Sequence, residues 1–409
     1  GDCMERVILH CDLNCFFASV ELLEHPELRQ VPTAVCGDPA SRHGIILAKN
    51  EAAKRYGVVT AETIWQARKK CPGLVLLPPH RERYTYYSRK VNEIYGHYTD
   101  LVEPFGIDES WLDITGSMNL FGGDPKAIAD RIRRQVREDT GLTLSVGVSF
   151  NKVFAKLGSD YRKPDATTVI PPEGWQDIVW PLPVDALLFV GRSVKRVLAG
   201  YGVQTIGDLA RCKPEMLETL LGKNGLQLYE YANGLDRSPV RPQHQHEPVK
   251  SVGNGTTFTH DLTSWDAVRT GLSLLSDSIA MRLRQQGLFC SGLSVAIKNN
   301  QFKTVSRQMQ LPAPTHLIRD IYQAALTLTG HLWKPPSPIR MITVTALYLT
   351  DSTASWQQMD LLGTPPEKNE KREKLESAMS AIRGKYGKSA IAFGKAANAD
   401  GHQKLEDDS

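Results

Sequence analysis

The chain has 409 residues, more than one hydrophobic core usually serves, so we expect several domains. With 41% hydrophobic and 23% charged residues, the composition is that of an ordinary globular protein. No apolar run approaches the roughly 20 residues needed to cross a bilayer, and the seven cysteines include no CxxC pair. These features argue against a membrane protein, a disulfide framework and a structural zinc site, and we expect the protein to work in the reducing cytoplasm.

The formal net charge is only +4, but it is unevenly distributed along the chain. Residues 249–352 contain ten Lys and Arg against five Asp and no Glu, whereas the rest of the chain is close to neutral. Such a local excess is typical of a surface that holds an anionic polymer, although an ordinary solvated surface gives the same count. Charge alone therefore leaves both interpretations open.

Up to about residue 170 the sequence predicts alternating strands and helices. The β-branched run at 6–13 predicts a strand, and apolar residues at helical spacing predict a helix at 16–23. The later elements are expected as two strands around a tight turn within 101–115, a helix at 125–140, a strand at 142–150 and a helix that follows an Asn151 cap. This order favours an α+β sheet with helices on one face.

Between these elements, a segment that contains GIILAKNEAAKRYGV predicts a strand followed by a helix and has the pattern of an inserted subdomain. From residue 171 the pattern becomes helical, with glycines at the turns. The segment 182–210 has the form of a helix-hairpin-helix, which offers backbone N–H groups to a DNA phosphate. Two helices packed around glycine turns without any DNA contact would give a similar sequence.

A polar, Pro-rich stretch predicts a linker at 242–248. Beyond it, four strands and two helices are expected over 249–352, which would form a second α+β domain and carry the local excess of positive charge. Residues 353–409 form a polar tail with a charged, helix-like stretch near 367–383.

Three carboxylates stand at positions where a metal site is expected. Asp12 ends the apolar run of the first strand, and Asp108 and Glu109 lie in the tight turn of GIDES. A hairpin beside the first strand would bring them together, and such a cluster needs cations because buried like charges repel. Mg²⁺ prefers hard oxygen ligands, and two such ions are the usual device for in-line phosphoryl transfer. Unrelated turn and capping acids would show the same spacing, so spacing alone does not decide.

Five motifs in one order resemble the Y-family DNA polymerases, most closely their bacterial polymerase IV branch. They are LHCDLNCFFASVE, GIILAKNEAAKRYGV, FGIDESWLDIT, LSVGVSFNKVFAKLGSDYRKPD and the hairpin at 189–209, and the resemblance covers about residues 5–365. It implies an α+β, multi-domain, right-hand polymerase. The implied parts are a ferredoxin-like palm (1–36 and 80–170), small fingers (37–79), a helix-hairpin-helix thumb (171–241), the linker (242–248), an α+β little finger (249–352) and the tail (353–409).

The same resemblance implies a template-dependent, low-fidelity polymerase that copies damaged DNA by adding dNTPs to a primer 3′ end. Asp12 and Asp108 would bridge two Mg²⁺ ions, Glu109 would hold the catalytic ion, and the Leu13 carbonyl would reach the ion bound to the nucleotide. No protein side chain needs to act as a covalent nucleophile in this chemistry. Primer-template DNA and dNTP are the implied partners, and we expect a monomer.

Two adjacent aromatics follow the first strand. By the resemblance, Phe17 is the steric gate under the sugar of the incoming nucleotide, where a 2′-hydroxyl would collide with the ring, and Phe16 supports the same floor. Without the resemblance, both would be interpreted as core aromatics at the start of a helix. The gate therefore depends on the family match.

Cationic residues are implied to meet the triphosphate. Lys163 matches a family lysine that contacts phosphate, and Lys54 lies where many members have Arg, although a solvated helix face would explain it equally well. Glu51 departs from the family pattern, because many members have a Tyr there and an acid would repel phosphate. Lys49 is a candidate to compensate for that charge.

Other departures leave the metal ligands in place. Asn14 replaces a common Asp, and Gly106 replaces a common Ser. Ile45 and Leu47 are bulkier than the small residues that often lie over the nascent base pair, so lesion tolerance is expected to differ from that of relatives.

In the tail, QQMDLLG resembles the peptide with which bacterial polymerases dock on the β subunit of the replication sliding clamp. Gln358 would anchor this peptide, and its apolar side chains, Met359, Leu361 and Leu362, would fill a groove on the clamp. The sliding clamp is therefore a further expected partner.

Two other functions are compatible with parts of the pattern. A two-metal nucleotidyl cyclase on a similar palm would need neither the hairpin nor the basic segment. A catalytically inactive, DNA-binding accessory subunit would be expected to lack the acidic cluster, but Asp12, Asp108 and Glu109 are all present.

Overall fold

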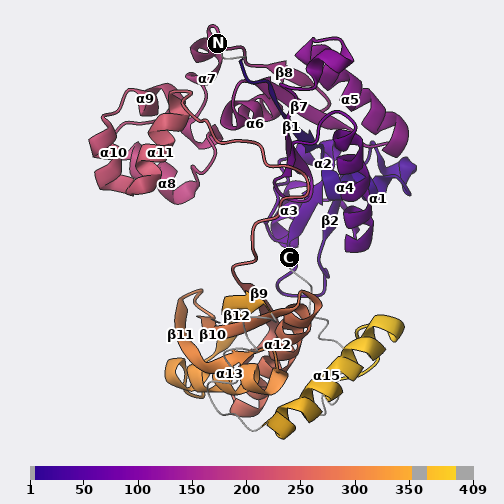
Figure 1. The fold of residues 1–409 in the computed structure, drawn as a ribbon, viewed down its shortest axis with the longest axis vertical. Coiled ribbons are helices and arrows are strands. Elements are labelled where there is room, and N and C mark those ends of the chain that lie inside the picture. The colour runs from indigo at the N-terminus through magenta and orange to yellow at the C-terminus, as the bar shows by residue number, and fades with distance from the viewer. Residues whose placement is uncertain (1–4, 352–365, 393–409) are drawn as a thin grey trace. The chain divides into compact units, whose positions relative to one another are not determined.

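The computed structural model describes residues 5–351 and 366–392 (Figure 1). The chain divides into two compact units, residues 1–246 and 247–409, and each is described by itself. Within the described ranges, no helix is both long and apolar enough to cross a membrane.

A five-stranded sheet organises the first unit, in the order β5-β6-β1-β7-β8. The central strand β1 (Ile8–Leu13) pairs antiparallel with β6 (Glu109–Asp113) and β7 (Leu144–Ser149), and every residue of β1 and β7 is buried. The outer strands are β5 (Val102–Pro104) and β8 (Thr167–Val169). This α+β arrangement agrees with the fold class expected from the sequence.

Helices cover both faces of this sheet, so the expectation of one covered face is wrong (Figure 1). Three helices, α1 (Phe16–Leu22), α4 (Arg81–Gly96) and α5 (Pro125–Thr140), share a core with one face of β1. The opposite face carries α6 (Lys152–Tyr161), whose expected Asn151 cap is confirmed because the Asn151 side chain accepts from the Phe154 N–H at 2.8 Å. The physical reason is that β1 and β7 are buried on both sides: on the α6 face, His10 is hydrogen-bonded to Ser159 of the helix, and Gly147 lets the helix approach closely.

The close approach of α6 depends on Gly147 in β7. A Cβ at this position would lie 1.8 Å from the Ala155 carbonyl oxygen and 2.4 Å from the Ser159 nitrogen, so no other residue fits without moving the helix. Facing it, a Cβ on Gly158 would lie 2.9 Å from the Gly147 Cα. Two glycines therefore set the spacing between α6 and the sheet.

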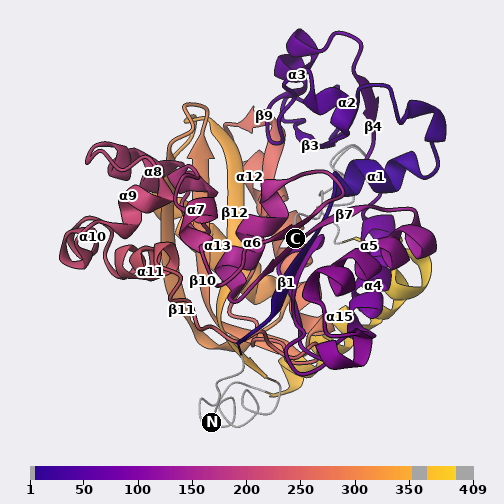
Figure 2. The same cartoon turned by 90° about the horizontal axis from the view of Figure 1, so that it is seen from above.

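A second, three-stranded sheet, in the order β3-β2-β4, has its own small core (Figure 2). Its strands are β2 (Thr33–Cys36), β3 (Ile46–Lys49) and β4 (Val75–Leu77), with α2 (Glu51–Lys54) and α3 (Ile64–Lys70) beside them. Because β2 pairs with both β3 and β4, this subdomain begins before residue 37, the boundary expected from the sequence.

Short 3₁₀ helices lie at Pro26–Leu28 and Met118–Phe121.

From residue 171 to 232 the first unit is helical and shares a core with one side of α6. Its helices are α7 (Trp175–Val179), α8 (Arg192–Ala199), α9 (Ile206–Ala210), α10 (Pro214–Leu221) and α11 (Lys223–Ala232), with a 3₁₀ helix at Val184–Ala186. The hairpin α8–α9 turns at Gly202, where φ is +75°, and α9 begins with a Thr205–Asp208 capping box.

After α11 the chain returns to the five-stranded sheet. Val240 is buried beside Ile8 and Trp111, and Arg241 pairs with the buried Glu103 at 3.1 Å. Gln243, inside the expected linker, donates its backbone N–H to the Asp100 carbonyl at 3.1 Å. The first part of the linker is therefore fixed to the first unit.

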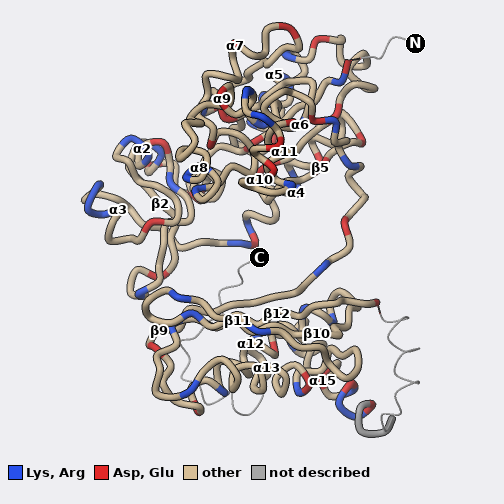
Figure 3. Tube along the Cα trace, turned by 90° about the vertical axis from the view of Figure 1, so that its left-hand side faces the viewer, with Lys and Arg blue, Asp and Glu red and all other residues tan. Residues whose placement is uncertain are grey.

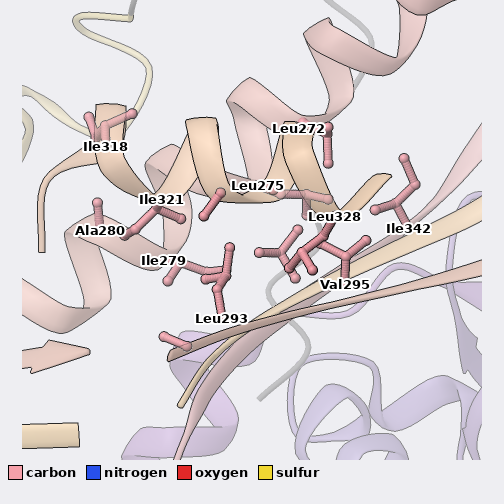
Figure 4. Packing of buried hydrophobic residues seen from close by; sticks show 14 of the residues in the cluster. Leu272, Leu275, Ile279, Ala280, Leu293, Val295, Ile318, Ile321, Leu328 and Ile342 are labelled. Carbon is pink, nitrogen blue, oxygen red and sulfur yellow. The ribbon is translucent and has the colours of Figure 1, made fainter. Parts of the chain in front are cut away.

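The second unit contains a four-stranded antiparallel sheet, in the order β11-β10-β12-β9. Its strands are β9 (Val252–Leu262), β10 (Leu288–Asn299), β11 (Thr304–Thr315) and β12 (Ile339–Asp351), and its helices are α12 (Trp265–Gln285) and α13 (Ile318–Leu332). Leu275 and Ile279 of α12 and Ile321 of α13 meet Leu293 and Val295 of β10 in its core (Figure 4).

The helix α15 (Pro366–Tyr386) packs against the helices of this second unit, and charged residues of both signs occur along it (Figure 3). Arg383 forms two hydrogen bonds with Asp277 of α12, at 2.8 and 2.7 Å, and Glu376 pairs with Arg284. Met379 is buried beside these ion pairs. The helix expected in the tail is thus held by paired charges around an apolar contact.

Candidate active site

The pairing of β1 with β6 brings the three predicted carboxylates to one edge of the five-stranded sheet. Asp12 and Glu109 are direct partners across the two strands, and the Leu13 N–H donates to the Asp108 carbonyl at 3.0 Å. Because side chains alternate along a strand, Asp12 and Glu109 lie on the face covered by α6. The backbone thus brings together Asp12, Leu13, Asp108 and Glu109, as the sequence predicted.

Two lysines neutralise two of these carboxylates. Lys156 of α6 forms an ion pair with Glu109, and Lys163, just after α6, pairs with Asp12 and with Asp160, the latter at 3.0 Å. The charges of Asp12 and Asp160 raise the pKa of Lys163 against the effect of its burial. Lys163, predicted from the sequence to meet the triphosphate, therefore lies at the acidic cluster.

The third carboxylate, Asp108, experiences both burial and the charge of its neighbours. Burial raises the pKa of Asp108, and the negative charges of Asp12 and Glu109 raise it further, to about 6. Burial also raises the pKa of Asp12 and of Glu109, in both cases against the lysine beside it. Negative charge at this edge of the sheet is thus only partly compensated by the protein.

The donor atoms fit a divalent cation. Three carboxylates and the nearby backbone carbonyl of Leu13 are hard oxygen donors, and the raised pKa of Asp108 shows where added positive charge would be stabilising. Across residues 5–351 and 366–392, no three His, Cys, Asp or Glu side chains are already arranged as a metal-binding group. At this site, Lys156 instead pairs with Glu109, and Lys163 pairs with Asp12.

Sequence reasoning missed His10, which lies beneath Glu109. His10 is fully buried, its Nδ1 lies 2.7 Å from the Ser159 hydroxyl, and its Nε2 lies 3.6 Å from the Glu109 carboxylate. Burial lowers the pKa of His10 well below its usual value, and the charges of Lys156 and Lys163 lower it further. The available signal was its position two residues before Asp12, which places both side chains on one strand face.

Phe16 and Phe17 lie at the start of α1, next to this edge. Phe16 is buried, whereas Phe17 is half-buried and its ring is stacked on Tyr84 of α4, with centroids 4.0 Å apart and an angle of 11° between planes. Phe17 therefore has one ring face against Tyr84, a partner that the sequence did not suggest.

The two other lysines predicted to meet the triphosphate, Lys49 and Lys54, lie in β3 and α2. Lys49 donates to the Thr60 hydroxyl at 3.3 Å, and Lys54 is exposed on α2. Glu51 accepts from the Cys15 thiol at 3.5 Å, so it contacts the residue that precedes α1. The structure gives Lys49 a different partner from Glu51, and compensation between the two stays a prediction.

The small sheet also carries the two bulky residues Ile45 and Leu47. Ile45 is 38% exposed and Leu47 is half-buried. The strand pairing shifts at Leu47, because Ile46 pairs with Cys36 and Ala48 pairs with Val35. A bulge of this kind changes the direction of a side chain near a functional site.

Two departures from the family pattern have structural explanations. Asn14 donates to the Ser145 hydroxyl at 3.0 Å and accepts from the Asp165 N–H at 2.9 Å, so its amide ties β1 to β7 and to the loop after Lys163. Gly106 has a φ of +88°, a conformation that a Ser adopts only with strain. The predicted clamp peptide, with Gln358, Met359, Leu361 and Leu362, lies outside the described residues.

Comparisons with known proteins agree with one another. The profile of the impB/mucB/samB family matches residues 11–160, and the profile of the C-terminal domain of that family matches residues 249–361. DNA polymerase IV of Acetivibrio thermocellus is 45% identical over 96% of this chain and 97% of that protein, and DNA polymerase IV 1 of Bacillus subtilis is 34% identical over 95% and 92%. A solved chimeric Y-family DNA polymerase has the same fold, with a TM-score of 0.75 and 23% identity over 85% of this chain and all of that chain.

The crowding of carboxylates predicts a pH-dependent gain in stability for Asp108→Asn. The pKa of Asp108 in the folded protein, about 6, exceeds its ordinary 3.8, so ionising this group disfavours folding as pH rises through that interval. In EDTA at pH 7.5 we expect the free energy of unfolding to rise by roughly 1–2 kcal/mol, since partial exposure screens the charges. At pH 4 the gain should nearly vanish.

Urea denaturation at the two pH values measures this difference. Asp139→Asn, an exposed position on α5, is the control and should change stability by less than about 0.5 kcal/mol. An equal effect of Asp108→Asn at both pH values would contradict the charge-crowding explanation.

Proposed function

The chain belongs to the impB/mucB/samB family of Y-family DNA polymerases, and on that premise we propose how its residues copy DNA. It is a DNA-directed DNA polymerase of the low-fidelity, translesion class, with DNA and dNTPs as substrates and a divalent metal as cofactor. The catalytically inactive subunit and the nucleotidyl cyclase are not favoured, because polymerases are similar to this chain along nearly its whole length.

The observation that carries the site assignment is the register of β1 against β6, which places Asp12 opposite Glu109 with Asp108 beside them. We propose that the metal is Mg²⁺, that two ions bind, and that Asp12, Asp108 and Glu109 would hold them. The Leu13 carbonyl would reach the ion that arrives with the nucleotide. When bound, these ions supply Lewis-acid activation of the primer 3′-hydroxyl and neutralise the charge that develops on the transferring phosphoryl group.

The chain itself contributes positioning and fixed charge. Lys163 pairs with Asp12 and Asp160 at the cluster, and we propose that its ammonium contacts the triphosphate. Lys54 and Lys49 would add positive charge from α2 and the small sheet. No side chain forms a bond to the substrate in this scheme, and the 3′-oxygen attacks the α-phosphate with release of pyrophosphate.

We assign the palm to the five-stranded sheet, the fingers to the three-stranded sheet, the thumb to α7–α11 and the little finger to the second unit. The N-terminus of the eight-residue helix α8 and the Lys and Arg side chains of the second unit are suited to phosphate contacts, which hold DNA without reading its sequence. We propose that the chain works as a monomer in the reducing cytoplasm, with which the free thiols of the described cysteines are compatible.

Primer extension tests the whole assignment. With Mg²⁺ and four dNTPs, the protein should extend a primer on an intact template and past a single minor-groove guanine adduct. Asp108→Ala should lower the rate at least about 10³-fold, because the remaining two carboxylates cannot replace a shared ligand. DNA binding without extension by the unchanged protein would instead favour the accessory-subunit function.

Sugar discrimination tests the gate. Phe17→Ala should raise rNTP incorporation relative to dNTP by about 100-fold or more, because the ring no longer excludes a 2′-hydroxyl. Single-nucleotide kinetics with matched rNTP and dNTP measures the ratio. Phe121→Ala, an aromatic truncation in the same core at a ring that packs on Tyr98, is the control. An unchanged ratio in Phe17→Ala would remove the gate assignment.

Binding to the sliding clamp is proposed from the peptide at Gln358, Met359, Leu361 and Leu362. Leu361→Ala together with Leu362→Ala should weaken binding to the clamp β subunit about 10-fold or more, because two apolar anchors are lost, while primer extension without the clamp stays unchanged. Surface plasmon resonance on immobilised clamp measures this, with Thr353→Ala together with Ser355→Ala as the control. Undiminished binding by the leucine variant would exclude this peptide as the docking site.

A further inference from the structure

The proposed gate is one member of a cluster of three aromatic rings. Phe17 lies flat on Tyr84 at 4.0 Å, and Phe16 is tilted against both, with its centroid 5.8 Å from that of Phe17 and 6.2 Å from that of Tyr84. Tyr84 is fully buried and Phe17 is half-buried. Any movement of Phe17 toward the protein interior is therefore opposed by the Tyr84 ring.

Tyr84 is itself held by its hydroxyl group. The hydroxyl donates to Oε1 of Glu21 at 2.6 Å and accepts from the His80 N–H at 3.1 Å. The bond to Glu21 is buried and the bond from His80 is partly buried, and losing a buried bond leaves a polar group without a partner. The ring that supports Phe17 is thus fixed in position as well as packed.

Glu21 is an acidic residue with no role in the polymerase chemistry described above. It is 1% exposed and is approached by Nδ1 of His80 at 2.8 Å and by Nη1 of Arg83 at 3.3 Å, in addition to the Tyr84 hydroxyl. A buried carboxylate is costly unless such partners surround it, and apolar residues of similar size are often at least as stabilising. Stability alone is therefore a weak reason for a carboxylate here.

The position of Glu21 on α1 suggests a different reason. Glu21 follows Phe17 by four residues, and residues at this spacing lie on the same face of a helix. The same short helix therefore contacts Tyr84 twice, with the Phe17 ring on its face and the Glu21 carboxylate at its hydroxyl. Tyr84 cannot slide along or tilt away from Phe17 without breaking the bond to Glu21.

We propose that Glu21 is a positioning residue for sugar discrimination: by holding the Tyr84 hydroxyl it keeps Tyr84 behind Phe17, so that the gate cannot recede from a ribonucleotide. This inference rests on the proposed gate function of Phe17. It adds Glu21 and Tyr84 to the residues that determine specificity, although neither side chain is placed against the nucleotide.

Tyr84→Phe is the sharpest variant, because it removes the hydroxyl and leaves the stacked ring. We expect the ratio of kcat/KM for dNTP to kcat/KM for rNTP to fall about fivefold, mainly through faster rNTP incorporation, with kcat/KM for dNTP within about twofold of the unchanged protein. Glu21→Gln keeps an oxygen for the Tyr84 hydroxyl but forms a weaker, uncharged bond, so its ratio should fall by a smaller factor. Glu21→Gln also provides a second test of the proposal if Tyr84→Phe folds poorly.

Tyr98→Phe is the matched control. Tyr98 is 3% exposed, belongs to the same core, and donates to a side chain, Gln135, at 2.6 Å, but it does not contact Phe17. Tyr98→Phe, which removes this hydroxyl, should lower the melting temperature as much as Tyr84→Phe does. It should not change the ratio of kcat/KM for dNTP to kcat/KM for rNTP. A role limited to core stability would affect both variants alike, and an equal fall in their ratios would overturn the proposal.

A double-mutant cycle separates this inference from the gate itself. In a Phe17→Ala background, Tyr84→Phe should have no further effect on the ratio, because there is no gate left to support. If Phe17→Ala alone leaves the ratio unchanged, the proposed gate is wrong. If Phe17→Ala lowers the ratio but Tyr84→Phe and Glu21→Gln do not, the gate stands and the role of Glu21 is refuted.

Discussion

The mutual repulsion of three carboxylates at the end of two paired strands is the constraint on which the rest of the first unit depends. Asp12 and Glu109 are partners on the neighbouring strands β1 and β6. Burial and the charges of these two residues favour the protonated form of Asp108. An arrangement that costs folding free energy persists only where the surrounding structure determines it. Here the buried strands β1 and β7 do so, with a helix layer on each face.

The two faces of the sheet contribute different interactions, with ion pairs on one face and aromatic packing on the other. On the α6 face, Lys156 and Lys163 pair with acidic side chains, and the buried His10 lies next to Glu109. This face therefore sets the charge around the carboxylates. On the α4 face, Tyr84 and Phe17 are stacked aromatic rings that determine shape. Because β1 lies between them and carries Asp12 just before its last residue, Leu13, a single strand positions the proposed metal ligand and leads into the helix that carries the proposed gate.

Much of this organisation could be predicted from the sequence, because it is encoded locally. The strand before Asp12, the turn at Asp108 and the Asn151 cap follow from periodicity and capping rules. Contacts between distant residues could not be predicted in that way. Glu21 has the sequence pattern of a surface acid on a helix, and only the approach of His80 and Arg83, some sixty residues later, makes it a buried one. Likewise, periodicity gives the apolar residues of α6 but not the sheet face that they cover.

The pair of glycines between α6 and β7 has a consequence for mutational tolerance. Gly147 pairs with His10 in the sheet, and any side chain there would push back the helix that carries Lys156 and Ser159. A saturation screen scored by activity would therefore rank Gly147 with the acidic residues, although it has no functional group to lose. Distinguishing such a position from a ligand requires protein abundance to be scored as well, since displacing α6 impairs folding whereas replacing a metal ligand leaves the fold intact.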